Sequence, residues 1–486
     1  MTDSNLVRLA YAKETSWGED VVSPSLRNIR YTGETISNNI TTTKSTEIVT
    51  DRLTTDLPQT GDSASGPIQI LLSFGEYDDF FEAALMGTWN TTPYKDNNGT
   101  EDSNITNVTA STYTFTVASG GTAFVANHLI YNSGFDDAAN NGLFKVGSST
   151  TSTIVAANTP TLVDDSTPAA NARIKVVGFE GASGDIAATS SGLSSTSLDF
   201  TTLGLSVGQW CKIGGSATAN KFTGNPENND WVRIAAITSH LLTLDNLPEN
   251  WATDSGSSKT IQVFFGDVLK SGSERQSFVI EKGFLGLDIP VYIPFKGMMV
   301  NTFSLSFQPG EIVSGSFTFM GKNAGDAVET PLDSSVTDSE SGEIMNAFRD
   351  VGRISEGGSV IAGPSYIQGF SISATNNLRE QKGVGVYGLA GVGIGDFEVT
   401  GDISVYFEEV SMYNKIVNNT ATSFSVIIGK SNQAYIFQLP RVKLGAGTPQ
   451  ATSRNTDVVI SSNFTALKDP TTGQALCIDR FEYYAE

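Results

Sequence analysis

The sequence predicts a mainly β protein, and three observations carry this prediction. Glycine makes up 48 of the 486 residues and charged residues only 17%, a composition typical of strands joined by many turns. Several long stretches alternate apolar and polar side chains with a period of two, which marks a strand with one buried face. Helical periodicity is confined to two short segments. The hydrophobic residues, 39% of the chain, suffice for a packed core, and the length favours two or three domains.

The charge balance excludes several classes of partner. The chain carries 30 Lys and Arg against 52 Asp and Glu, a net charge of -22, so its surface repels nucleic-acid phosphates and anionic membranes. No stretch approaches the roughly 18 apolar residues of a membrane span, and the first residues lack a signal-peptide pattern. Cys211 and Cys477 lie far apart and are predicted to be buried free thiols. We therefore expect a soluble protein without a disulfide framework.

Two short helices are expected. The first has one apolar face with spacings of three and four, formed by Tyr77, Phe80, Phe81, Ala84 and Leu85. Acidic residues at its start suit the helix dipole, and Gly87 is expected to end it. The second helix is predicted over 341–352, with Ser341 as its N-cap and Ile344, Phe348 and Val351 on one face.

Strands are expected along most of the remaining chain. Residues 1–65 are polar and weakly patterned, which predicts an extended arm with a few short strands, and residues 66–75 predict a regular strand. After residue 268 the alternation becomes long and regular. Strands are predicted there at 365–373, 396–407, 422–429, 433–439 and 456–467.

Residues 301–321 predict a β-hairpin whose register can be argued. A two-residue loop at Pro309 and Gly310 would place Phe303, Leu305 and Phe307 opposite Ser316, Ser314 and Ile312. A three-residue loop, Pro309 to Glu311, places them opposite Phe317, Gly315 and Val313 instead. Because a slip of one residue turns a whole face over, the matching of aromatic residues favours the longer loop.

Between 96 and 268 the chain repeats itself. Residues 141–160 align without a gap on 229–248, at an offset of 88, and residues from 174 resemble those from 261. This self-similarity predicts two tandem β modules of about 85 residues, each a small sandwich or barrel. Two copies are too few for a solenoid.

The segment "GVGVYGLAGVGIG" contains the spacing G-x-G-x-x-G of a dinucleotide-binding loop, at Gly383, Gly385 and Gly388. A dinucleotide site needs a strand before this loop and a helix after it. Here a polar turn precedes the glycines and an alternating strand follows them. We therefore interpret the match as accidental and predict a long loop between two strands.

Motifs of catalysis or metal binding are not found. His128 and His240 have no nucleophile or ligand motif beside them, and the "DDAANNG" segment at 136–142 is better read as a turn than as a calcium loop. Trp210, Trp231 and Trp251 could stack on sugars, but core packing explains them better. A large β protein with no apparent reaction indicates a role in structure and assembly.

Several stretches resemble one known family, in the order in which they occur there. They are "RLAYAKETSWGE" at 8–19, "TKSTEIVTDR" at 43–52, the strand and helix at 66–89, the hairpin at 294–321, "YIQGFSISATNNLRE" at 366–380 and "GDISVYFEE" at 401–409. Together they resemble the tail tube (major tail) proteins of long-tailed, non-contractile bacteriophages. The resemblance covers about 1–95 and 269–486.

This resemblance implies a tail-tube-type β-sandwich or barrel core with one flanking α-helix, six copies per ring, and rings stacked into a hollow tube. DNA would pass through an acidic-lined conduit during ejection without tight binding. No catalytic residue, metal or cofactor is implied, so the chain is not expected to be an enzyme. The expected partners are further copies of the chain and the tail terminator, tape measure and distal tail proteins of the same phage. The protein would be part of the virion and be assembled in the host cytoplasm.

The resemblance also divides the chain. Segment 1–95 would hold the N-terminal arm and the first part of the core, 96–181 and 182–268 two inserted modules that decorate the outside, and 269–486 the rest of the core. The candidates for the lumen side are Ser304, Ser306, Gln308 and Glu311. The candidate inter-ring contacts are the N-terminal arm and the loop 380–395, with Gly383, Gly385, Tyr387, Gly388 and Gly393. The helix would pack on the core through Tyr77, Phe80, Phe81 and Leu85.

Other functions stay open at this point. A carbohydrate-binding or adhesion protein would act through the tandem modules, which could also contact host-surface glycans on a tube. A polysaccharide hydrolase or lyase would need a charged cleft, for which there is no local signal. A tube from a contractile tail is a close variant.

Overall fold

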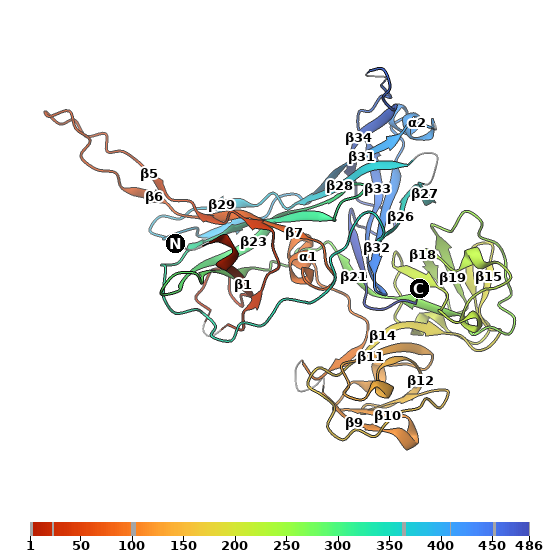
Figure 1. Ribbon diagram of the computed structural model, residues 1–486. Coiled ribbons are helices and arrows are strands. Elements are labelled where there is room, and N and C mark those ends of the chain that lie inside the picture. Colours follow the sequence, from red (N-terminus) through yellow and green to blue (C-terminus); the bar gives the residue numbers. More distant parts are fainter. Residues whose placement is uncertain are drawn as a thin grey trace.

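The computed structural model describes residues 3–21, 24–98, 104–361, 366–408, 410–450 and 453–485. In these ranges the chain is mainly β, as predicted, with two α-helices, α1 (Asp78–Leu85) and α2 (Ser411–Val417), and several single 3-10 turns. The first is the flanking helix that the sequence predicts. Figure 1 shows an elongated core with a hairpin projecting from one end and two smaller β units beside the other.

The core is one large, strongly bent sheet that folds over itself. Among the described residues its strands are β1 (Val7–Lys13), β2 (Arg27–Asn28), β3 (Gly33–Glu34), β4 (Ser37–Asn38), β7 (Ala64–Leu71), β21 (Asp267–Lys270), β22 (Phe278–Phe284), β23 (Val291–Phe307), β24 (Ser314–Gly321), β25 (Asn323–Ala324), β26 (Val351–Glu356), β27 (Ser359–Val360), β28 (Ile367–Thr375), β31 (Glu398–Tyr406), β32 (Thr422–Lys430), β33 (Gln433–Leu444), β34 (Val459–Ala466) and β35 (Cys477–Phe481). Two further pairs stand apart, β5 (Thr41–Thr42) with β6 (Gln59–Gly61), and β29 (Arg379–Gln381) with β30 (Gly391–Gly393).

The central strands run in the order β7, β24, β23, β28, β31 and β34, and each is antiparallel to the next. The hairpin β23–β24 has the register predicted for the three-residue loop, because Phe303 lies opposite Phe317 and Leu305 opposite Gly315. The strands predicted after residue 268 are also confirmed, as β28, β31, β32, β33 and β34. Ser365, at the start of the first of them, lies outside the described residues.

Helix α1 packs on the apolar side of this sheet. Phe81 is fully buried, and its ring centroid lies 5.2 Å from that of Phe303 and 5.6 Å from that of Phe317. Tyr77, Phe80 and Leu85 are each 1% exposed. The helix ends as expected, but Met86 rather than Gly87 takes the left-handed conformation. Gly87 is needed for another reason: a Cβ there would lie 2.1 Å from the carbonyl oxygen of Lys270.

Residues 94–265 form a second sheet. Its strands in the described residues are β8 (Tyr94–Asp96), β9 (Ile105–Thr109), β10 (Thr114–Val117), β11 (His128–Ser133), β12 (Gly142–Ser149), β13 (Thr153–Ala156), β14 (Arg173–Glu180), β15 (Ala187–Thr189), β16 (Gly192–Ser194), β17 (Trp210–Ile213), β18 (Trp231–Ile237), β19 (Leu241–Asp245) and β20 (Gln262–Phe265). Two six-strand units have the same strand order, β14-β11-β12-β13-β10-β9 and β20-β17-β18-β19-β16-β15, and meet where β14 pairs with β20.

The repeat extends to single side-chain hydrogen bonds. Asn141 binds both backbone groups of Phe135, and Asn229, 88 residues later, binds both backbone groups of Phe222. The preceding residues do the same: the Asn140 amide binds both backbone groups of Val163, and the Asn228 amide binds both backbone groups of Ala252. The segment at 136–142 is therefore a structural turn whose Asn side chains replace missing backbone partners.

Two sequence predictions are wrong. The N-terminal stretch is not an arm throughout, because β1 pairs with β22 along its whole length and its Leu9 is 1% exposed. The second predicted helix does not form, and 346–350 are a turn. The side-chain oxygen of Asn346 accepts hydrogen bonds from the backbone N–H groups of Phe348 and Arg349. In a continuous helix over 341–352 these N–H groups would instead donate to the carbonyls of Ile344 and Met345.

Candidate assembly surfaces

The central sheet has one polar face, lined mainly by hydroxyl groups. The register places six side chains in one row across six strands: Gln69, Ser316, Ser304, Ser373, Thr400 and Thr465. Ser304 and Ser316 share a hydrogen bond of 2.9 Å. The next row contains Ser314, Ser306, Ser371, Asp402 and Asn463. We call these two rows the hydroxyl face.

The opposite side of the same strands is apolar. Phe303, Leu305 and Phe317 alternate with the hydroxyl residues and are at most 1% exposed. This is the pattern of an antiparallel sheet with one face packed on the core and the other face toward solvent. In the two rows, as far as the structure describes them, Asp402 is the one ionisable side chain; next to the rows, Glu398 lies opposite Thr375 and Lys443 opposite Thr465.

The margins of this sheet are unequal. Residues 32–39 run along the outer side of β7 through β3, β4 and several backbone hydrogen bonds. At the other margin the ladder between β33 and β34 runs from Phe464 to Ala466, and beyond it the segment 445–450 lies along β34. The Gly445 N–H group donates to the Asn463 carbonyl at 2.7 Å, a Cβ on Gly447 would lie 2.8 Å from the Ser461 carbonyl oxygen, and a bridge joins Gln450 to Val459. This margin is therefore covered by an irregular segment rather than by a regular strand.

The outer margins of the two repeat units are closed. Asp165 exchanges two backbone hydrogen bonds with Val108 on β9, and Asp254 exchanges two with Ala188 on β15. The bridges occupy equivalent places in the two repeats. Strand edges that are covered in this way do not invite pairing with other copies.

One end of the core carries the candidate inter-ring segments, and we call it the arm end. The hairpin of β5 and β6 projects from it (Figure 1), with Ile48 and Leu53 exposed at its tip. The loop 380–395 is not one open loop: β29 and β30 pair at its base, and Leu389 is fully buried. Gly383, Gly385 and Tyr387 are exposed, Gly388 is half-buried and Gly393 is buried.

The candidate lumen residues lie together only in part. Ser304 and Ser306 are half-buried on the hydroxyl face, and the Gln308 amide reaches back to the Ser306 hydroxyl at 3.5 Å. Glu311 is exposed in the turn between β23 and β24. This turn marks the opposite end of the core, which we call the turn end. The sequence reasoning missed Ser373, Thr400 and Thr465, although their strands show the same alternation.

The repeat units are docked firmly on the core by aromatic side chains. Tyr483, near the C-terminus, stacks on Tyr131 of the first repeat with ring centroids 4.3 Å apart. Trp231 of the second repeat meets Phe481 edge-on at 4.9 Å. Trp210 is fully buried at the same contact. These tryptophans therefore pack against the core, and the Trp251 indole donates a hydrogen bond of 2.7 Å to the Thr189 carbonyl.

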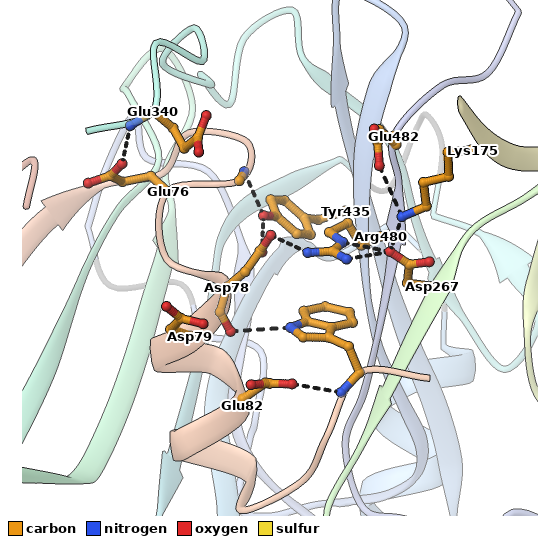
Figure 2. A network of polar contacts seen from close by, with 12 residues as sticks. Glu76, Asp78, Asp79, Glu82, Lys175, Asp267, Glu340, Tyr435, Arg480 and Glu482 are labelled. Atoms are coloured by element: carbon orange, nitrogen blue, oxygen red, sulfur yellow. Dashed lines mark hydrogen bonds and ion pairs between the residues drawn. The ribbon is translucent and has the colours of Figure 1, made fainter. Parts of the chain in front are cut away.

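A buried charge network fixes this junction (Figure 2). The Arg480 guanidinium on β35 donates to Asp267 on β21 and to Asp78 on α1, and lies 4.6 Å from the ring centroid of Trp89. From the first repeat, the Lys175 ammonium reaches the Asp267 carboxylate at 2.6 Å. Burial raises the pKa of Asp267, but Lys175 and Arg480 outweigh it and hold that pKa below its ordinary value.

Asp479, at the same junction, predicts a pH dependence of stability. It is fully buried, and burial raises its pKa to about 7. A hydrogen bond that the Asp479 carboxylate accepts from the backbone N–H of Trp210 offsets this rise only in part. The protonated acid is favoured in the folded state, so its contribution to stability is lost as the pH rises from about 4 through about 7. Asp479→Asn is expected to remove this loss, worth a few kcal/mol.

The measurement is the free energy of unfolding from pH 4 to 8. Asp402→Asn, at an exposed carboxylate of the hydroxyl face, is the control and should leave the slope of the wild type unchanged. An Asp479→Asn variant that loses stability with pH as steeply as the wild type would contradict the assignment.

No group of side chains suited to hold a metal ion, and no helix long and apolar enough to cross a membrane, occurs in the described ranges. His128 is buried with Nε2 3.3 Å from the Leu203 carbonyl, and His240 Nδ1 lies 3.0 Å from the Leu198 carbonyl. Both histidines thus have structural partners. The features that stand out in the described geometry are the hydroxyl face, the sheet margins and the two ends of the core.

Comparison with known proteins relates the chain to a family. A search of curated proteins gives no match. A family model described as phage tail tube protein matches residues 4–229 and 244–466. The matched ranges include both ends of the core, the hydroxyl face and most of the repeat units. The chain belongs to the phage tail tube protein family.

Proposed function

We propose that this chain forms the wall of a phage tail tube as stacked hexameric rings, with the hydroxyl face lining the lumen. The observation that carries the proposal is the row of small polar side chains across six adjacent strands, backed by a dry core. The two rows hold hydroxyl and amide groups and the carboxylate of Asp402, with Lys443 at their margin, so they offer DNA phosphates no cluster of cations to bind. A net charge of -22 on the chain adds repulsion, so DNA can slide through.

Ring closure is supported by the irregular margin of β34. The segment 445–449 that covers it forms no regular strand, and a neighbouring copy can add a strand along its outer side. The repeat units form a sheet separate from that of the core, so their strands do not continue this margin. This separation supports a place for them outside the tube wall, as decoration.

Stacking is supported by the two unlike ends of the core. The arm and the loop 383–388 lie at the arm end, and the turn 309–311 lies at the turn end. A contact between unlike ends is heterologous, and repeated contacts of this kind build an open filament rather than a closed pair. The ends of the finished tube would be the surfaces that the tail terminator and distal tail proteins bind.

Accessibility of a cysteine on the hydroxyl face tests the lumen assignment. Cys211 and Cys477 are both buried, so Ser314→Cys, at an exposed position, introduces a reactive thiol. We expect this thiol to react with a bulky polyethylene glycol maleimide in the free subunit and to be protected in assembled tubes. The reason is that the reagent can reach the lumen only through the tube ends.

Ser111→Cys, exposed on the first repeat, is the matched control and should react in both states. Equal reaction of the two variants in tubes would contradict an inward hydroxyl face. Protection of Ser111→Cys alone would place the repeats, instead, inside the assembly.

A further inference from the structure

A cavity of about 340 Å³ lies at the arm end, between the root of the arm and the glycine-rich loop. Its walls include Thr60, Asp62, Val386 and Tyr387. Asp62 is 5% exposed, forms no ion pair among the described residues, and has the Tyr387 phenol as a neutral hydrogen-bond donor beside it. A carboxylate has about four acceptor sites, so Asp62 keeps acceptor capacity for a cation from outside the chain.

The Tyr387 phenol supplies one neutral donor to Asp62. The charge of Asp62 and this hydrogen bond raise the pKa of the phenol. Lys382 also lines the cavity, but its ammonium pairs with Glu380 at 3.1 Å. Apolar contact is offered by Val386, which is 45% exposed.

The turn end presents a matching pair of side chains. Phe348 is 79% exposed, and its neighbour Arg349 is also exposed, with no ion pair for its guanidinium among the described residues. The turn that carries them is rigid, because Asn346 accepts from both backbone N–H groups and donates to Asp350. Exposed aromatic and arginine side chains held in this way are typical centres of protein interfaces.

The two features flank opposite ends of one strand, β7. Asp62 lies two residues before it, and the backbone N–H of Met345 donates to Leu72 just after it. The ladder between β7 and β24 runs from Ala64 to Leu71, seven steps or about 23 Å. Arg349 therefore cannot reach Asp62 of its own chain.

We propose that the Phe348–Arg349 turn of one copy docks into the Asp62 cavity of the next copy along the stack. The Arg349 guanidinium pairs with the Asp62 carboxylate, and the Phe348 ring covers Val386 and Tyr387. This contact rests on the proposed stacking of rings and names the side chains that join them. Because each copy offers both halves, the contact propagates in one direction only.

A charge exchange tests the pairing. Asp62→Arg and Arg349→Asp should each reduce the number of tubes seen by negative-stain microscopy about tenfold or more, because each places like charges together. The double variant restores opposite charges and should recover most of the wild-type yield. Single variants that assemble normally, or a double variant no better than the single ones while all remain folded, would overturn the proposal.

A second measurement covers the case in which Asp62→Arg fails to fold. Val384→Cys, on the glycine-rich loop, and Glu311→Cys, beside the Phe348–Arg349 turn, lie at exposed positions outside the proposed pair, and the native cysteines are buried. Combined in one chain and treated with a short bis-maleimide, they should give a ladder of linked copies in tubes, whereas either single variant should not. Tubes without a ladder overturn the contact. If the wild type forms no tubes even on a tail tip, the proposed function itself fails.

Discussion

Replacing Arg480 with alanine is expected to lower the free energy of unfolding by about 3–5 kcal/mol. The change leaves Asp267, which is fully buried, with Lys175 as its one remaining cation among the described residues, and it leaves Asp78 without its cation. Breaking a buried ion pair from one side costs this much because a desolvated charge remains. Chemical unfolding followed by circular dichroism measures the loss.

Arg173→Ala is the matched control. Arg173 pairs with Glu482 at 3.0 Å in the same region, but its side chain is 34% exposed, so the expected cost is below about 1 kcal/mol. The account of the junction is wrong if both variants lose the same amount.

Phe81→Ala is expected to cost a similar amount, about 3–5 kcal/mol, through lost packing. The ring is fully buried and meets Phe303, Phe317 and Tyr435 at centroid distances of 5.2 to 5.7 Å. Its removal opens a cavity between α1 and the apolar side of the central sheet. The thermal midpoint of the free subunit reports the change.

Phe348→Ala serves as the comparison, because Phe348 is 79% exposed. We expect it to change the stability of the free subunit by less than about 0.5 kcal/mol while weakening assembly. If Phe348→Ala destabilised the subunit as much as Phe81→Ala, the turn at 346–350 would be misplaced and the helix first expected there would have to be reconsidered.

Local patterns predicted much of the core. The alternation of residues after 268 gave the central strands, and the pairing of Phe303 with Phe317 followed from matching aromatics across a turn. These features depend on neighbouring residues or on one short loop, so one sequence suffices to find them. The internal repeat was visible for the same reason, since its two copies share the residues that hold their turns.

The false helix shows where such patterns fail. Ile344, Phe348 and Val351 have helical spacing, but Asn346 binds the following N–H groups and Val351 already begins β26. Side-chain competition for the backbone outweighed apolar spacing in a segment too short to be a stable helix by itself.

The junction between repeats and core could not be predicted. Asp78, Lys175, Asp267 and Arg480 come from four distant segments, and none of them stands in a recognisable motif. The Asp62 cavity likewise forms only when the arm root meets the glycine-rich loop. Such sites arise from contacts between segments that are distant in the sequence, and local residue patterns do not predict which distant segments meet.

A cryo-electron microscopy map of assembled tubes, at a resolution that shows side chains, tests the central claim most directly. The account predicts that Ser304, Ser316 and Ser373 face the lumen, with Phe303 and Phe317 behind them, and that the repeats project outward. A map in which the hydroxyl face points away from the tube axis, or is covered by a neighbouring copy, would contradict it.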